Sequence, residues 1–191
     1  MANLGRTLLA FVLFSWCAGS SIVAAQTAAN PDAKLLVDFQ ERVKKYVELH
    51  KSAKKDGPPI KETKDAAAIK ASQDALSANI RAMRPAARQG EIFTPEIAKL
   101  VRRLMYPETV GREGAETKQT LKEDAPPRAA VTLKVNARYP DAQPLPTMPP
   151  NLLANLPKLP EELEYRIVGK DLILRDVPAN LIVDYIPGAI R

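Results

Sequence analysis

The sequence of 191 residues is poor in the side chains on which most catalytic and metal sites depend. It has one cysteine, Cys17, one histidine, His50, and few serines after residue 25, namely Ser52, Ser72 and Ser77. A nucleophilic triad needs a base beside its nucleophile, and a zinc site needs three or four ligands. A lone histidine among lysines near a helix end is typical of a solvated residue. We therefore predict no metal, no cofactor and no nucleophilic active site.

Carboxylates are numerous enough to leave one catalytic alternative. Two acids can act as general acid and base at many spacings, and Glu161, Glu162 and Asp184 are the candidates near the C-terminus. The first two follow Pro160 at the entry to a predicted strand, a position that is typical of solvated residues. An envelope-acting hydrolase with paired carboxylates is therefore the alternative to a non-enzymatic function.

Residues 1–25 have the features of an export signal. Arg6 precedes the apolar run from Leu8 to Trp16, which is shorter than the roughly 20 residues needed to span a bilayer. Val23-Ala24-Ala25 then predicts signal peptidase cleavage before Gln26. An uncleaved anchor is the alternative, and Trp16 argues against a lipoprotein signal at Cys17. We expect an exported protein, periplasmic or extracellular.

Residues 26–107 are predicted to be helical. Asn30-Pro31-Asp32 combines a helix cap, a proline at the first position and an acid in the first turn, and Gly57-Pro58-Pro59 is a helix stop. A second helix is expected from about Thr63, and a third with Thr94 as its cap and Pro95 at its first position. The simplest packing is an antiparallel hairpin of the first two helices with the third beside it.

Residues 108–160 are predicted to form a flexible and proline-rich connection. Few large apolar side chains occur from Glu108 to Ala130, whereas the alternation of residues 131–136 indicates one possible strand. Seven prolines between Tyr139 and Pro160 exclude a continuous helix and favour extended backbone. Only Asn151–Asn155 has room for a helical turn.

Residues 161–191 are predicted to form a small antiparallel β-meander, which makes the fold α+β. Three apolar runs are separated by Gly169-Lys170-Asp171, which suits a tight hairpin turn, and by residues 176–180. The sheet carries too much apolar surface for a free ribbon, so either the helices upstream or another molecule should cover it. A partner could enter the groove between the sheet and the helices, or bind the edge of the last run. We therefore predict a partner-binding edge, for an unknown protein or a second copy of the chain, at Leu181, Ile182, Val183, Tyr185 and Ile186.

The net charge of +6 is concentrated in the helical region, where basic side chains outnumber acidic ones. A basic patch there would fit an anionic envelope surface, and ordinary solvated helix faces are the alternative. Nucleic acid is not expected as a partner, because acids interrupt the basic stretches and no stacking aromatics accompany them. The candidate patch comprises Lys44, Lys45, Lys51, Lys54, Lys55, Arg81, Arg84, Arg88, Arg102 and Arg103.

The signal, the alanine-rich helical front, the proline-rich middle and the run of residues 165–190 together resemble uncharacterised exported bacterial proteins of unassigned function. The resemblance is limited to the signal peptide and residues 165–190, and it implies no catalytic residue. The sequence thus predicts a secreted or periplasmic protein with a non-enzymatic binding or envelope-structural role.

Overall fold

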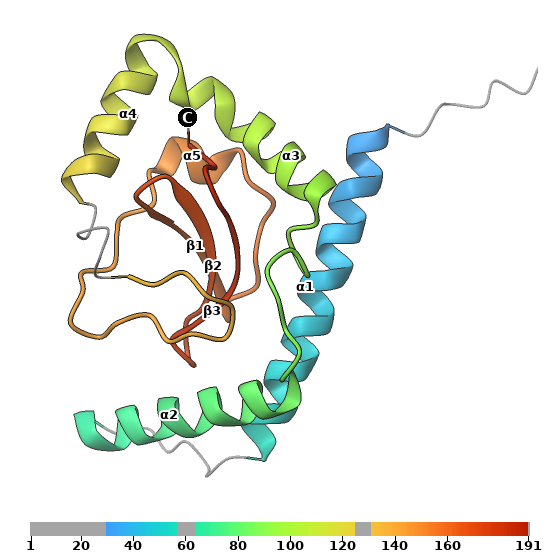
Figure 1. Ribbon diagram of the computed structural model, residues 1–191, viewed down its shortest axis with the longest axis vertical. Coiled ribbons are helices and arrows are strands. Elements are labelled where there is room, and N and C mark those ends of the chain that lie inside the picture. The colour runs from blue at the N-terminus through green and yellow to red at the C-terminus, as the bar shows by residue number, and fades with distance from the viewer. Residues whose placement is uncertain (1–29, 57–63, 125–130, 191) are drawn as a thin grey trace, which may run out of the picture.

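The computed structural model describes residues 30–56, 64–124 and 131–190, which form helices packed on a C-terminal three-stranded sheet (Figure 1). The predicted signal, 1–25, and the predicted helix stop at Gly57-Pro58-Pro59 lie outside the described residues. The elements, in chain order, are α1 Pro31–Lys55, α2 Ala66–Met83, α3 Pro95–Met105, the 3-10 helix η1 Tyr106–Thr109, α4 Gly111–Glu123, α5 Pro150–Ala154, β1 Leu163–Val168, β2 Asp171–Asp176 and β3 Leu181–Ile186. The predicted α+β class and the C-terminal meander are confirmed.

The first helices begin where their capping residues indicate. The Asn30 side chain accepts a hydrogen bond from the Asp32 N–H, and Thr94 caps α3 through the Ile97 N–H. Proline occupies the first position of both helices, where its missing N–H costs no hydrogen bond. The second predicted helix is α2, which begins at Ala66 with Asp65 as its cap.

The sheet has the strand order β1-β2-β3, with both pairs antiparallel. Gly169 has a φ of 63°, so the hairpin between β1 and β2 uses the left-handed conformation that glycine adopts without strain. Asn180 adopts a φ of 50° at the end of the second turn. The register between β2 and β3 shifts after Leu174, so that Asp184 pairs with Leu174 and Ile182 with Arg175.

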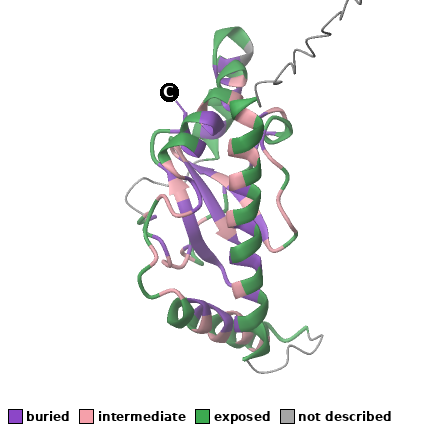
Figure 2. Ribbon diagram, turned by 90° about the vertical axis from the view of Figure 1, so that its right-hand side faces the viewer, coloured by how far each residue is buried: buried purple, intermediate pink, exposed green. Residues whose placement is uncertain are grey.

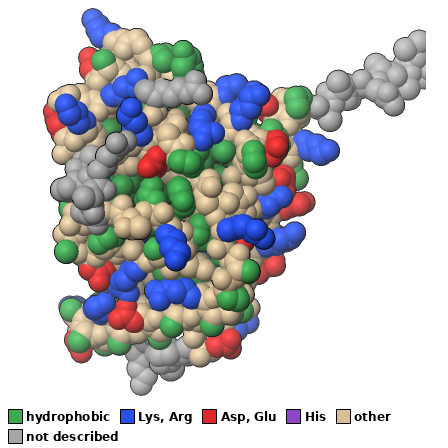
Figure 3. All heavy atoms as spheres, viewed as in Figure 1, with side chains coloured by type: hydrophobic (Ala, Val, Ile, Leu, Met, Phe, Trp, Pro, Cys, Tyr) green, Lys and Arg blue, Asp and Glu red, His purple; other side chains and the backbone are tan. Residues whose placement is uncertain are grey.

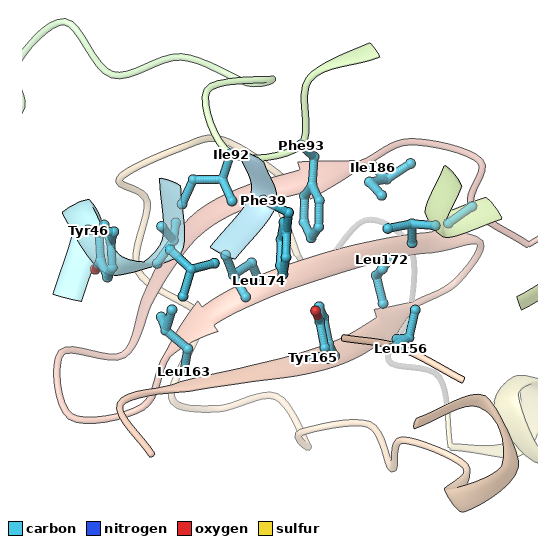
Figure 4. Close-up of a cluster of buried hydrophobic side chains, with 14 of the residues drawn as sticks. Phe39, Tyr46, Ile92, Phe93, Leu156, Leu163, Tyr165, Leu172, Leu174 and Ile186 are labelled. Atoms are coloured by element: carbon cyan, nitrogen blue, oxygen red, sulfur yellow. The ribbon is translucent and has the colours of Figure 1, made fainter. Parts of the chain in front are cut away.

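The main core lies between one face of the sheet and the helices. In Figure 2 the buried strands lie behind α1, whose outer side is exposed. Phe39 of α1 and Phe93, just before α3, stack with ring centroids 5.8 Å apart above Leu172 and Leu174 (Figure 4). A smaller cluster on the other face joins Val168, Ile173 and Ile182 with Val131 and Tyr139. Both faces of the sheet are therefore covered.

The helical region differs from the predicted hairpin in its packing. α2 crosses the C-terminal end of α1 at a steep angle in Figures 1 and 2, instead of running antiparallel along it. The apolar stripe of α1 is occupied by the sheet, and α2 buries only Leu76, Ser77 and Ile80. With so little apolar surface to share, the two helices contact each other near their ends.

Two predictions for residues 108–160 are wrong. The stretch expected to be a flexible connection contains α4, which reaches the core through Leu121. Gly114 allows this packing, since a Cβ atom there would overlap the Thr109 backbone. Residues 131–136 form no strand and instead lie across the second face of the sheet, where Val131 packs with Ile173. The predicted turn near Asn151–Asn155 is α5.

Candidate functional site

The predicted partner-binding edge is largely buried. The side chains of Leu181, Ile182, Val183 and Ile186 are at most 1% exposed, and Tyr185 is partly buried. Their apolar surface is thus sheltered by the rest of the chain. It is not available to a partner in this arrangement.

The backbone edge of β3 is covered as well. The Asn136 N–H donates to the Ile182 carbonyl at 2.9 Å, and the Ile182 N–H donates to the Ala137 carbonyl at 2.9 Å. Further along the strand, the Gln89 amide donates to the Tyr185 carbonyl, and the Tyr185 N–H donates to the Asp184 carboxylate. A strand added here would have to displace these groups.

The carboxylates of the hydrolase alternative have separate partners. Asp184 is fully buried and accepts hydrogen bonds of 2.8–2.9 Å from the backbone N–H groups of Gly90, Ile92 and Phe93. Glu162 forms an ion pair with Lys51, while Glu161 is exposed on the surface. Asp184 therefore holds the loop before α3 against the sheet, and no contact joins it to the two glutamates among the described residues.

His50 is buried, so its interpretation as a solvated residue is wrong. Its Nδ1 lies 2.6 Å from Oδ2 of Asp176 in β2, and the Tyr46 hydroxyl donates to the same oxygen at 2.7 Å. Burial raises the pKa of Tyr46, and the Asp176 carboxylate raises it further. No Ser, Thr or Cys side chain shares a hydrogen bond with His50 in the described chain, so this cluster joins α1 to the sheet and lacks a nucleophile.

The basic side chains of the helical region do not form one continuous free patch. Arg84 is mostly buried, pairs with Glu91 and lies over the Tyr46 ring at 5.1 Å from its centroid. Arg81 donates to the Ser77 hydroxyl and Arg103 pairs with Asp32, whereas the lysines of α1 are exposed. The predicted patch is therefore divided among several local contacts.

A groove on the opposite edge of the sheet has the features of a binding site. It has a volume of about 630 Å³ and lies between the first half of β1 and the chain that precedes it. Such volumes are typical of ligand pockets. Its walls are mainly apolar, and Leu153 within them is 48% exposed. The groove is lined by Thr147, Met148, Leu153, Ala154, Leu156, Pro157, Lys158, Leu159, Leu163, Glu164, Tyr165 and Arg166.

The register of the sheet directs backbone groups of β1 into this groove. Glu162 and Val177 form a hydrogen-bonded pair of the antiparallel ladder, since the Glu162 carbonyl accepts from the Val177 N–H at 2.9 Å. Alternation in an antiparallel pair then turns the N–H and C=O of Tyr165 away from β2. Neither group has a hydrogen-bond partner outside the β1–β2 ladder in the part of the chain that the structure describes.

Proline explains why the facing wall leaves this edge unpaired. Residues 146–159, which supply this wall, include Pro146, Pro149, Pro150 and Pro157, which have no backbone N–H to donate to a neighbouring strand, and Pro157 itself lines the groove. The wall is held instead by side chains. The Tyr165 hydroxyl donates to the Pro157 carbonyl at 3.1 Å, and Arg166 donates to the Pro146 carbonyl at 3.1 Å.

The floor of the groove carries an ion-pair network. Glu164 pairs with Arg166 beside it and with Arg175 on β2. Burial opposes ionisation of Glu164, but the hydrogen bonds from these two arginines outweigh it and lower the pKa of the carboxyl. Burial also raises the pKa of Tyr165, so its hydroxyl stays a donor at neutral pH. Together with the bonds to Pro157 and Pro146, these contacts fix the facing segment against β1.

Comparison with family models, with curated proteins and with solved structures finds no match for this chain. The resemblance of residues 165–190 to exported bacterial proteins therefore stays a prediction. No described helix combines the length and apolar character required to cross a bilayer. Among the same residues, no group of three or more His, Cys, Asp or Glu side chains is placed to hold a metal ion.

Proposed function

We propose that this protein is a non-catalytic binding protein that takes an extended peptide segment into the groove beside β1. The observation that carries the proposal is an apolar groove beside β1, in which the backbone groups of Tyr165 turn away from β2. Tyr165 itself is 3% exposed, so an entering peptide has to separate the wall from β1 to reach these groups. Main-chain hydrogen bonds to such an edge provide affinity for any extended chain, and the apolar walls select its side chains. The site is thus the edge opposite the predicted one.

The shape of the groove favours one strand over a whole second sheet. An open flat edge accepts the edge strand of another copy, whereas this edge faces a wall formed by residues 147–159. Apolar side chains of an incoming strand would lie against Leu153, the exposed large apolar side chain of the wall. From residues 1–25 we further propose that the encounter takes place outside the cytoplasm.

Selection of peptides from a displayed random library with the full chain tests this function. We expect extended sequences with apolar residues at alternate positions, because only one face of the incoming strand contacts the walls. Methylation of single peptide nitrogens should then weaken binding at every second position, where the N–H is directed at β1. Uniform tolerance of methylation would rule out strand addition.

A matched pair of variants locates the site. Leu153→Lys places a charge on the groove wall, whereas Ile69→Lys changes a similarly exposed residue on α2, since the two side chains are 48% and 52% exposed. Full burial of a leucine contributes about 1.5–3 kcal/mol, and the bound peptide would cover the exposed half of Leu153. Loss of this contact and the cost of covering a charge should together weaken a selected peptide by about tenfold in Leu153→Lys. Ile69→Lys should leave its affinity unchanged. Equal effects would contradict the assignment.

The paired-carboxylate hydrolase stays the alternative function, and no observation favours it. Activity of the full chain against glycan, ester and peptide substrates tests it directly. Activity that requires Glu161, Glu162 or Asp184 would displace the binding proposal.

A further inference from the structure

A second cavity, apart from the groove, lies beside α3 and the C-terminal end of the chain. It has a volume of about 550 Å³ and is lined by Lys99, Arg102, Arg103, Tyr106, Thr109 and Ala189. The three basic residues are spaced three and four apart, so they share one side of α3. The upper part of the face in Figure 3, where α3 lies in Figure 1, carries several Lys and Arg side chains.

The cavity differs from its neighbour in charge. In the cavity between α1 and the loop before α3, carboxylates line the wall, and Arg42 and Arg84 are paired with Asp38 and Glu91. No carboxylate lines the α3 cavity. Its nearby acid is Asp32, which pairs with Arg103. The lining residues are therefore net positive even when Asp32 is counted with Arg103.

The basic groups are held in place by the end of the sheet. Arg102 donates one guanidinium N–H to the Pro187 carbonyl at 2.9 Å, which positions the rest of the fork. The segment that carries Pro187 is itself fixed, since the Gly188 N–H donates to Asp171 and the Ile190 N–H donates to the Lys170 carbonyl. Lys99 is exposed and has no ion-pair partner among the described residues.

We propose that this cavity binds a phosphate group. A phosphomonoester carries about −1.5 to −2 charge at neutral pH, which complements the positive lining, and its three oxygens accept from several donors at once. Arginine forks suit the geometry of phosphate, and lysine adds a point charge. The exposed ring of Tyr106 forms a wall for the group attached to the phosphate. A free organic phosphate and a lipid headgroup share this chemistry.

Calorimetry and vesicle flotation with the full chain test the proposal and distinguish the two sources. The small probes are inorganic phosphate and glycerol 3-phosphate. The membrane probes are vesicles that contain phosphatidic acid, whose headgroup is a phosphomonoester, with pure phosphatidylcholine vesicles as the control. Binding of the small probes assigns a soluble phosphate, whereas binding of the anionic vesicles alone assigns a headgroup.

Two double variants separate a site from general charge. K99Q with R103Q removes two cations of the cavity, and R88Q with K122Q removes two exposed cations elsewhere. We expect the first pair to weaken binding more than about tenfold, the loss of a charge-assisted hydrogen bond, and the second to change it less than about twofold. Equal weakening by both pairs, or no binding of any probe, overturns the proposal. Peptide binding in the β1 groove should be unaffected by either pair.

Discussion

The two edges of the sheet differ in how their backbone groups are covered. The β3 edge is closed by polar side chains and by residues 136–139, which supply backbone N–H groups to it. The β1 edge faces a proline-rich wall that has few such groups to supply, and a groove remains between them. The comparison teaches that the residues beside a strand, more than those of the strand itself, decide whether its edge is free.

The largest expected effect comes from a substitution that removes contacts closing the β3 edge. Asp184→Ala removes the acceptor of several buried N–H groups, each of which costs about 1–3 kcal/mol when left unpaired. We expect the free energy of unfolding in urea to fall by about 3–5 kcal/mol. Asp171→Ala, which loses one exposed bond to Gly188, serves as the control and should cost less than about 1 kcal/mol. Similar losses for both variants would contradict a role of Asp184 in closing this edge.

A second variant loosens the closed edge at its start. The Asn180 side chain accepts from Arg175 and donates to the Tyr139 carbonyl, and its φ is positive. Asn180→Ala should lower the unfolding free energy by about 1–3 kcal/mol and speed hydrogen exchange of the Ile182 amide. Asn180→Gly removes the same contacts but relieves the backbone, so it should cost less. Unchanged exchange at Ile182 would show that Asn180 does not hold the covering segment.

A third prediction compares the hydrogen bonds that the Tyr165 and Tyr139 hydroxyl groups donate. Tyr165 holds the wall of the open edge through the Pro157 carbonyl, and Tyr139 makes a like bond to the Pro144 carbonyl. Replacement of either by Phe should cost about 1 kcal/mol in urea unfolding. Only Tyr165→Phe should alter the affinity of the groove for a selected peptide. An equal change in peptide affinity in both variants would show that the hydrogen bond from Tyr165 to Pro157 does not shape the groove.

The smallest expected effect concerns pH. The pKa of Glu164 is lowered in the folded state, so its stabilisation is present above the ordinary carboxyl pKa of about 4.3 and is lost as pH falls through the folded value. Glu164→Gln should therefore be less stable than the parent at pH 7 by at most about 1 kcal/mol, because the network is partly solvated. The difference should shrink as pH falls below the ordinary carboxyl pKa and vanish once the folded-state pKa has been passed. A difference that grows toward low pH would contradict this sign.

Local signals predicted much of the fold. Asn30, Thr94 and the prolines that follow them determine where α1 and α3 begin, because capping and the loss of an N–H are local effects. The hairpin turn at Gly169 also depends only on neighbouring residues. His50 shows a signal that was available and was missed: it lies four residues after Tyr46, on the apolar stripe of α1 with Phe39 and Val43.

The groove was not predictable from the same patterns. The prolines of residues 140–160 indicate extended chain, but no local pattern states which strand edge that chain lies beside. The apolar density of β3 indicated that something covers it, but not whether this is the same chain or a partner. Tertiary packing buries it under α1 and residues 131–139. Likewise Asp184 has partners from a loop more than ninety residues earlier, which chain order alone does not reveal.

By itself the sequence determined the starts of α1 and α3, the three strands with their turns, and the absence of thiol chemistry beyond Cys17, because each depends on neighbouring residues or on composition. Only the tertiary structure decided that His50 and Asp184 are buried, that the β3 edge is closed and that the β1 edge lines a groove. Those outcomes depend on contacts between segments far apart in the chain, where the hydrogen-bonding needs of one segment are met, or left unmet, by another.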